Sequence, residues 1–198
     1  MSQLEFDFMQ FKPARVIGLA GARGSGKDWI GRKLQELDSN VVLLAFADDL
    51  KKEIAEAIGH PLDYVESHKE ELRPLLQVWG TEYRRDFCLE SYWLDKMSER
   101  LKGVPSGATV VITDVRFNNE VDFIHSLGGQ VLRISRAGVI RELEDVDFHR
   151  SEKAIETLPT DGTVINDPDQ PQVLEQVLNN ILNECPVTEP TTIPMQLA

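Results

Sequence analysis

The chain has 198 residues, of which 41% are hydrophobic, and a formal net charge of −12 at pH 7. This length suits a single domain with a substantial core, and the negative charge argues against broad binding to nucleic acids or acidic membranes. An anionic ligand would therefore have to be held by locally clustered Arg and Lys side chains.

The first 13 residues predict an arm that ends at Pro13. The stretch Gln3–Phe8 alternates apolar and polar residues, which is typical of an edge strand or a docked arm. It is also similar to the short Gln-Leu-x-hydrophobic peptides that dock on bacterial sliding clamps, so clamp docking is a second hypothesis. The start of the chain lacks a basic flank before an apolar core, which argues against a signal peptide, and no apolar run approaches the length of a membrane span.

A strand, a glycine-rich turn and a helix come next. Val16–Ala20 is an apolar run, and Ile30, Leu34 and Leu37 follow at helical spacing. The turn between them has the Gly-x4-Gly-Lys spacing of a phosphate loop, whose amides and helix N-terminus bind anions. We expect this loop to bind a nucleoside triphosphate; the alternative is a glycine turn without a ligand. The expected ATP-binding residues here are Gly21, Ala22, Arg23, Gly24, Ser25, Gly26, Lys27 and Asp28, the last standing where Ser or Thr is usual.

The continuous apolar run Val41–Phe46 predicts a strand buried on both faces. Asp48 and Lys51 follow it, at the start of a helix that Gly59 and Pro61 should end. Ligands bind at the carboxyl ends of strands in open α/β sheets, so Asp48 and Lys51 are site candidates. Helix capping and a solvated charge cluster are the alternative.

The segment from about 60 to 102 reads as helical, with a glycine at position 80 inside the apolar-patterned stretch. Arg84 and Arg85 are the candidates to clamp a second phosphate, because guanidinium groups bind phosphates bidentately. An exposed, salt-bridged helix face is the alternative. The two cysteines, Cys88 and Cys185, have neither metal-ligand spacing nor the pattern of a disulfide framework, which suits a reducing compartment.

The run Ala108–Asp114 predicts a buried strand ending in an aspartate, the Walker B arrangement in which a carboxylate meets the magnesium shell. A helix or turn cap is the alternative role of Asp114. A helix through Val121–Leu127 and a fourth strand at Gln130–Ile134 follow.

The polar segment 135–150 predicts a lid whose arginines close over the transferring phosphates. A mobile surface loop with salt-bridged arginines is the alternative. A helix through Ala154–Leu158, a fifth strand at Thr163–Asn166 and a last helix to Leu182 complete the domain, and the proline-spaced tail 186–198 is expected to be disordered. The expected lid and catalytic arginines are Arg133, Arg136 and Arg141, and Asn166 and Asp167 are expected to border the adenine.

Alternating strands and helices predict a doubly wound α/β fold of the P-loop NTPase type. We expect a five-stranded parallel sheet, a helical acceptor-binding insert at about 60–102 and an Arg-bearing lid at about 135–150. The kinase domain would span 14–185. A core with an acceptor-binding insert and a basic lid is typical of a small-molecule phosphotransferase, which must exclude water.

Over roughly residues 14–182 the chain resembles the deoxynucleoside monophosphate kinases of bacteriophages, a branch of the P-loop nucleoside monophosphate kinases. The resemblance rests on the Gly-Lys-Asp ending of the loop, shared with some phosphomevalonate kinases, and on motifs at 46–51, 79–84, 113–120, 128–136, 149–152 and 165–167. It implies transfer of the γ-phosphoryl group of ATP to a (deoxy)nucleoside monophosphate, with Mg²⁺, in the cytoplasm, or in the host cytoplasm if a phage encodes the protein.

Roles follow as hypotheses from this resemblance. Lys27 neutralises charge at the transferred group, while Asp28 and Asp114 organise Mg²⁺. One or more of the lid arginines stabilises that group when the lid closes. The residues expected to bind the acceptor are Asp48, Lys51, Gln77, Glu82, Arg84, Arg85 and Arg116.

Three alternatives stay open. The acceptor could be phosphomevalonate or dephospho-coenzyme A; the chain could be a nucleotide-binding regulatory ATPase with no small acceptor; or it could be a catalytically inactive adaptor that uses its N-terminal arm. No nucleic acid or membrane partner is expected. The residues leave open the accepted bases, ribose against deoxyribose, and a homodimer.

Overall fold

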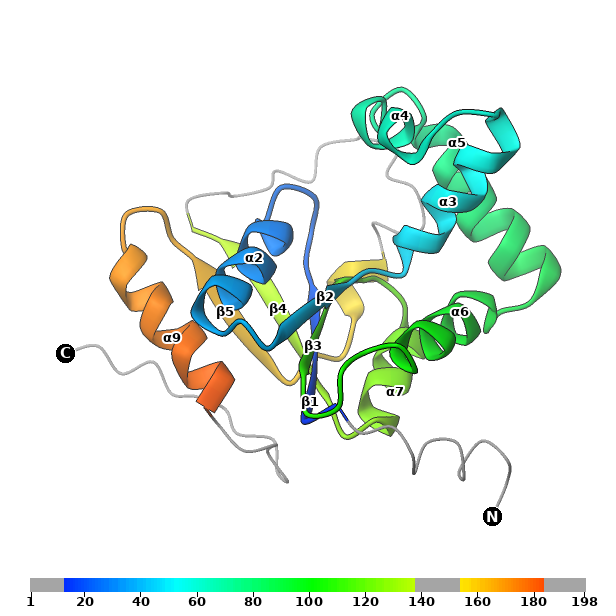
Figure 1. Ribbon diagram of the computed structural model, residues 1–198. Helices are drawn as coiled ribbons and strands as arrows, with labels where there is room; N and C mark the ends of the chain where they lie inside the picture. The colour runs from blue at the N-terminus through cyan, green and yellow to red at the C-terminus, as the bar shows by residue number, and fades with distance from the viewer. Residues whose placement is uncertain (1–12, 138–153, 184–198) are drawn as a thin grey trace, which may run out of the picture.

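The computed structural model describes residues 13–137 and 154–183. Five parallel strands form one sheet in the order β2-β3-β1-β4-β5 (Figure 1). The α/β fold class predicted above is therefore confirmed, including the number and direction of the strands. The strands are β1 (Arg15–Ala20), β2 (Val41–Leu44), β3 (Thr109–Val115), β4 (Gln130–Arg136) and β5 (Gly162–Asn166).

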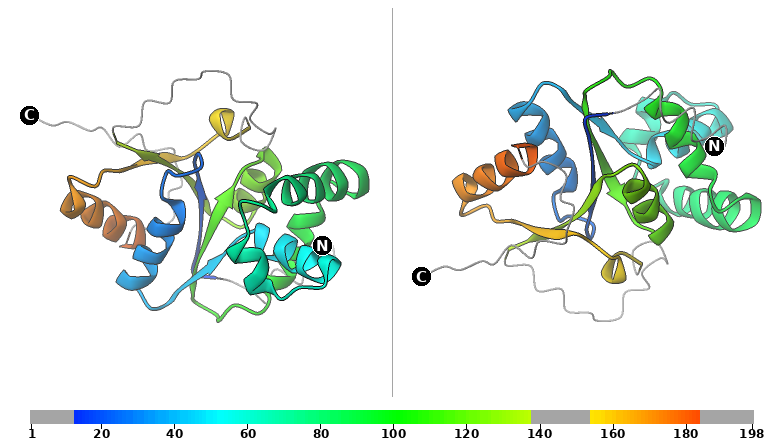
Figure 2. Two further views of the ribbon diagram at one scale, coloured as in Figure 1. Left: turned by 90° about the horizontal axis from the view of Figure 1, so that it is seen from above. Right: turned by 90° about the horizontal axis from the view of Figure 1, so that it is seen from below.

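Helices cover both faces of the sheet (Figure 2). On one face, α2 (Lys27–Leu37) and α9 (Pro171–Asn183) pack through residues such as Leu34 and Leu178 against the side chains of Ile17 and Leu19. On the other face, α6 (Tyr92–Leu101), α7 (Asn118–Ser126) and the short 3-10 helix η2 (Ala154–Thr157) cover the alternate residues. Alternate side chains of a strand point to opposite faces, so one apolar run supplies both cores.

A helical layer lies between β2 and β3 in the chain and projects beyond the sheet (Figure 1). It has a small core of its own around Ile54 and Val65. Its segments are α3 (Ala47–Ile58), α4 (Leu62–Ser67), α5 (Arg73–Gln77) and the π-helix η1 (Val78–Cys88), followed by α6. We refer to residues 60–102 of this layer as the insert.

Several element ends differ from the sequence-based expectation. Strand β2 stops at Leu44, because the next residues turn into α3. The sequence predicts that the last helix starts at 167–169, but α9 begins at Pro171, after a turn in which Asp167 accepts hydrogen bonds from the Asp169 amide and the Gln170 side chain. In the described chain, the helix expected after residue 150 is only the single turn η2.

Some predictions fall outside the described residues. These are the arm at Gln3–Phe8, Arg141 with the lid from 138 onward, Cys185 and the tail 186–198. Across residues 13–137 and 154–183, no helix combines the length and the apolar character needed to cross a bilayer.

Candidate active site

The glycine turn between β1 and α2 has the backbone shape of an anion-binding loop. Gly24 and Gly26 have φ of +77° and +94°, which side chains other than hydrogen rarely allow. A Cβ on Gly26 would lie 2.2 Å from Nδ2 of Asn166, whereas a Cβ on Gly24 would have no other atom within 4 Å. Asn166 supports the loop by donating to the Ser25 carbonyl at 2.9 Å. Such successive turns of the backbone make a concave nest of amides.

Lys27 begins α2 directly after this loop. Its ammonium group donates to the carbonyl oxygens of Gly21 and Ala22, the latter at 3.0 Å. It therefore lies over the loop where phosphate oxygens would be held. The loop and Lys27 fit a triphosphate, since the amides and the ammonium group are both donors that phosphate oxygens accept from.

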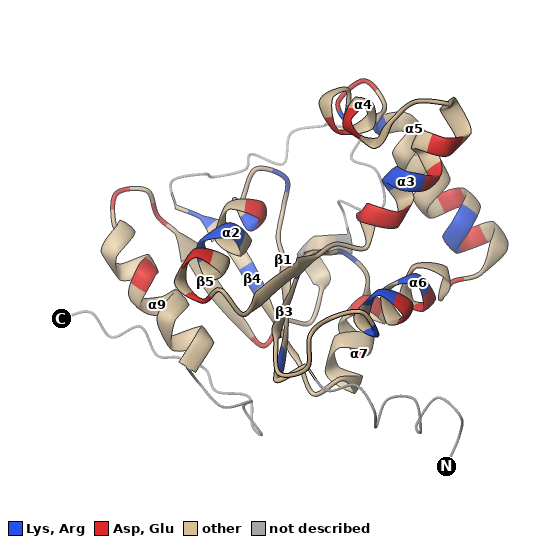
Figure 3. Ribbon diagram, viewed as in Figure 1, with Lys and Arg blue, Asp and Glu red and all other residues tan. Residues whose placement is uncertain are grey.

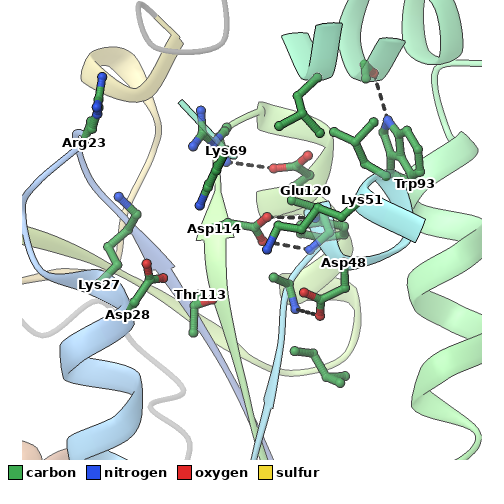
Figure 4. Close-up of a pocket in the computed structure, with 18 of the residues that line it drawn as sticks. Arg23, Lys27, Asp28, Asp48, Lys51, Lys69, Trp93, Thr113, Asp114 and Glu120 are labelled. Carbon is green, nitrogen blue, oxygen red and sulfur yellow. Dashed lines mark hydrogen bonds between the residues drawn. The ribbon is translucent and has the colours of Figure 1, made fainter. Parts of the chain in front are cut away.

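Asp114 lies near the carboxyl end of β3 and faces the same cavity (Figure 4). Its Oδ1 accepts from the Phe46 amide at 2.8 Å and its Oδ2 from the Ala47 amide at 2.9 Å. Burial raises the pKa of Asp114, and these amides together with Arg116 act in the opposite direction. The sequence left two roles open for Asp114, a magnesium ligand or a helix cap. In this structure its carboxylate caps the start of α3.

Asp28 lines the cavity as well, so two carboxylates lie close to the phosphate loop. Mg²⁺ at nucleotide sites is usually held by one or two carboxylates together with substrate phosphates and waters, and this pair fits that requirement. The described residues contain no cluster of three or more His, Cys, Asp or Glu side chains suited to a metal. The described residues therefore do not form a metal site that consists of protein ligands alone.

The cavity has a volume of about 890 Å³ and joins the phosphate loop to the insert. Basic side chains outnumber acidic ones on its wall, although the whole chain carries a net charge of −12. Figure 3 shows basic residues both on α2 and on α3. The cations are Arg23, Lys27, Arg32, Lys51, Lys69, Arg73, Arg85 and Arg116, and the carboxylates are Asp28, Asp48, Glu66, Asp114 and Glu120.

The two adjacent arginines of η1, Arg84 and Arg85, have different surroundings. Arg85 lines the cavity and pairs with Glu120 at 2.6 Å, with side chains only 5% and 3% exposed. Burial raises the pKa of Glu120 to about 7, although Arg85 acts to lower it. Arg84 is absent from the cavity wall: it pairs with Glu53 at 2.8 Å, and its guanidinium carbon lies 4.6 Å from the centre of the Tyr92 ring.

The expectation that either arginine could grip the acceptor phosphate thus needs correction for Arg84. Neighbouring residues of a helix point in directions roughly 100° apart, and here Arg85 points to the cavity while Arg84 points to Glu53. Of the other expected acceptor residues, Asp48, Lys51, Gln77 and Arg116 line the cavity, but Glu82 is exposed and does not. Asp48 also accepts from Arg100 at 2.7 Å, and Lys51 donates to Glu66 at 2.6 Å.

The described lid residues do not reach the cavity. Arg133 donates to the carbonyls of Ile155 and Leu158, both at 2.9 Å, and so holds η2 against the sheet. Arg136 is exposed at the end of β4 and does not line the cavity. In this conformation Arg133 has a structural role in place of the expected catalytic one, because it does not line the cavity and its guanidinium group holds the backbone around η2.

Sequence reasoning missed several residues that the fold brings to the cavity. Lys69 and Arg73 line it from the insert. Glu70 lies between them in the chain and accepts from Arg73 at 2.8 Å and from Arg23 of the loop at 2.6 Å. No local pattern marks these residues, since charges at i and i+3 are typical of any exposed helix.

A protein-family model and two viral proteins are similar in sequence to this chain. The family model described as "Phosphomevalonate kinase" matches residues 19–130. A protein of Acanthamoeba polyphaga mimivirus, named "Putative deoxynucleotide monophosphate kinase", is 27% identical over 196 residues, covering 85% of this chain and 96% of its own. "Uncharacterized protein ORF77" of Ictalurid herpesvirus 1 (strain Auburn) is 25% identical over 173 residues, covering 82% of this chain and 68% of its own.

Solved structures are also similar. TT1252 from Thermus thermophilus has a TM-score of 0.49 and 16% identity, covering 86% of this chain and 97% of that one. Shikimate kinase from Acinetobacter baumannii has a TM-score of 0.46 and 17% identity, covering 88% and 96%. The family match spans more than half of this chain, so the chain belongs to the phosphomevalonate kinase family and is a kinase of the P-loop type.

Proposed function

We propose that this member of the phosphomevalonate kinase family transfers the γ-phosphoryl group of ATP to a (deoxy)nucleoside monophosphate, giving a diphosphate. One observation carries the proposal: a single cavity connects the phosphate loop to basic side chains of the insert, in a chain that is otherwise strongly acidic. Two phosphate groups that approach each other need such a concentration of positive charge, since catalysis of phosphoryl transfer is mainly positioning and electrostatic stabilisation.

The cavity also suits an acceptor larger than its phosphate. A volume of about 890 Å³ lies in the range of small-molecule sites. Phe117 and Trp93 contribute aromatic surface to its wall, and Gln77 and Thr81 contribute uncharged polar groups. Aromatic faces with a few hydrogen-bonding groups are what a nucleobase requires. The name of the mimivirus relative agrees with this choice of acceptor.

Roles can be assigned to this chain's own residues. The loop amides and Lys27 would hold the triphosphate, and Asp28 and Asp114 would hold Mg²⁺ together with the ATP phosphates. When bound, Mg²⁺ would neutralise charge on the β- and γ-phosphates. Arg85 and Arg116, which also line the cavity, would hold the acceptor's phosphate.

The remaining residues of the cavity would complete acceptor binding. Lys69 and Arg73, which line the cavity from the insert, would add positive charge near the phosphates. Asp48, Lys51, Gln77 and Thr81, which also line the cavity, would bind the sugar and the base. Because the insert rather than the sheet carries most of these groups, movement of the insert would alter acceptor binding more than ATP binding.

Phosphomevalonate is a second candidate acceptor, favoured by the family match over residues 19–130. It is also a phosphate monoester, so the same cations would hold its phosphate. The two candidates differ at the other end, where a nucleotide presents a flat aromatic base and phosphomevalonate a short hydroxy acid with a carboxylate.

A coupled assay of ADP release tests the proposal. Purified protein with Mg²⁺ and ATP would be given each common ribo- and deoxyribonucleoside monophosphate, phosphomevalonate, dephospho-coenzyme A or no acceptor. We expect at least one nucleoside monophosphate to raise ADP release well above the rate without acceptor. A response to phosphomevalonate alone would select the second candidate. Slow hydrolysis that no acceptor changes would refute the proposal and favour a regulatory ATPase.

A further inference from the structure

The Arg85–Glu120 pair is more deeply buried than the other ion pairs between described residues, such as Arg84–Glu53 and the pairs of Arg100 with Asp48 and Asp49. Arg85 comes from η1 in the insert, and Glu120 from the first turn of α7, which follows β3. Both line the cavity. The pair therefore joins the acceptor side of the cavity to the strand that ends near Asp114.

Glu120 uses both of its oxygens. Oε1 accepts from Nη2 of Arg85 at 2.6 Å, while Oε2 accepts from the backbone amides of Arg116 at 2.7 Å and Phe117 at 3.2 Å. The same carboxylate thus caps α7 and shapes the turn that carries Arg116. At so buried a position the Arg85 guanidinium has few other acceptors to choose from. Its charged hydrogen bond to Glu120 therefore restricts the conformation of the Arg85 side chain strongly.

Arg85 is restrained on its other sides as well. Its Nη1 donates to Oδ1 of Asn119 at 2.9 Å, and its guanidinium carbon lies 4.0 Å from the centre of the Phe117 ring. The three contacts all come from residues 117–120. The remaining donor, Nε, is buried and has no hydrogen-bond partner among the described residues. An unmet buried donor is costly, so an acceptor oxygen bound there after a small rearrangement would gain more than on an exposed arginine.

We propose that Glu120 is a positioning residue, which holds the Arg85 guanidinium in the cavity wall so that it meets the phosphate ester of the acceptor. This inference rests on the proposed function and adds to it the residue that prepares the acceptor site. Glu120 acts through Arg85 and contacts no reacting atom. Its loss should therefore weaken acceptor binding selectively and leave the ATP side, built from the phosphate loop, unchanged.

The test is steady-state kinetics of Glu120→Gln with the best acceptor found in the ADP-release assay. Glutamine has nearly the same shape and keeps one oxygen for the two amides, but it offers Arg85 no charged partner. We expect the KM for the acceptor to rise about tenfold or more, since a hydrogen bond to a charged group contributes at least that factor, while the KM for ATP stays unchanged. Glu99→Gln is the matched control: this side chain is 71% exposed on α6, pairs with Lys102 and should change neither constant.

A double-mutant cycle separates positioning from general loss of structure. Arg85→Lys should raise the acceptor KM too, and adding Glu120→Gln to it should change little more. Glutamine keeps an oxygen for the Arg116 and Phe117 amides, so this substitution leaves their turn in place and acts through Arg85. If Glu120→Gln does not fold, Asn119→Ala removes one contact to Arg85 while leaving Glu120, and should raise the acceptor KM by a smaller factor.

The possible results distinguish failure of this inference from failure of the proposed function. Unchanged acceptor affinity in a folded Glu120→Gln protein, equal rises in both KM values, or additive effects in the cycle would overturn the inference while leaving the proposed function in place. A wild-type protein that phosphorylates no acceptor of the panel would instead overturn the proposed function and this inference with it.

Discussion

Replacing Gly26 by alanine should destabilise the protein more than the same change at Gly24, although both glycines have positive φ. An alanine in the left-handed region costs about 1–2 kcal/mol, and this cost applies to both positions. At Gly26 the new Cβ would also lie 2.2 Å from Nδ2 of Asn166, whereas at Gly24 it meets nothing within 4 Å. The two variants therefore share the backbone strain and differ in one steric contact.

That contact can be given a magnitude. Asn166 must move away from the new Cβ, and it then loses the hydrogen bond to the Ser25 carbonyl, now 2.9 Å long. Such a bond contributes about 1 kcal/mol. The free energy of unfolding should fall by about 2–3 kcal/mol for Gly26→Ala and by about 1–2 kcal/mol for Gly24→Ala. Any stabilisation from the lower entropy of the unfolded chain is the same for both and cancels in the difference.

Urea unfolding followed by circular dichroism measures these values. Asn166→Ala provides the internal check, because it removes both the hydrogen bond and the steric conflict. In the Asn166→Ala background, Gly26→Ala should lower the free energy of unfolding by no more than Gly24→Ala lowers it in the wild type. The reasoning fails if Gly24→Ala is at least as damaging as Gly26→Ala, or if the Asn166→Ala background leaves the cost of Gly26→Ala unchanged.

Three further predictions concern single side chains. Lys27→Ala should lower kcat about 10²–10³-fold, the usual effect of removing one group that stabilises the transition state, with an unchanged circular dichroism spectrum; near-normal turnover by the folded variant would contradict its role. Arg84→Ala should leave the acceptor KM unchanged but lower the free energy of unfolding by about 1–2 kcal/mol, because Glu53 loses a charged partner; a large rise in that KM would return Arg84 to the acceptor site. Burial raises the pKa of Glu120 in the folded protein to about 7, above its ordinary value of 4.5, so between these pH values the native state binds more protons than the unfolded state and the contribution of Glu120 to stability falls as the pH rises. Unfolding of wild type and Glu120→Gln across this range should show their stability difference shrinking as pH rises, and a constant or growing difference would show that the sign is wrong.

Much of the fold could be predicted because its signals are local. The strands buried on both faces are continuous apolar runs such as Val110–Ile112, and the phosphate loop is a spacing of glycines and one lysine within eight residues. Backbone conformation at Gly24 and Gly26 depends on the residue itself, so the turn could be expected before any contact was known. These features determine the fold class and the place where a triphosphate would bind.

Which residues line the proposed acceptor site was decided by the tertiary structure. Whether Arg84 or Arg85 faces the cavity depends on the phase of η1, a π-helix whose turn differs from that of the α-helix assumed in reading a pattern. The same holds for Lys69 and Arg73, which reach the cavity only because the insert folds across from the phosphate loop.

The chain by itself determined a parallel α/β sheet, a phosphate loop and a carboxylate at the end of the third strand, because each depends on neighbours in sequence. Only the folded structure decided which charges meet: Asp114 with the amides before α3, Arg133 with the backbone of η2, and Arg85 with Glu120. The physical reason is that an ion pair or a hydrogen bond depends on distance in space, and residues 35 positions apart acquire that distance only when their helices pack.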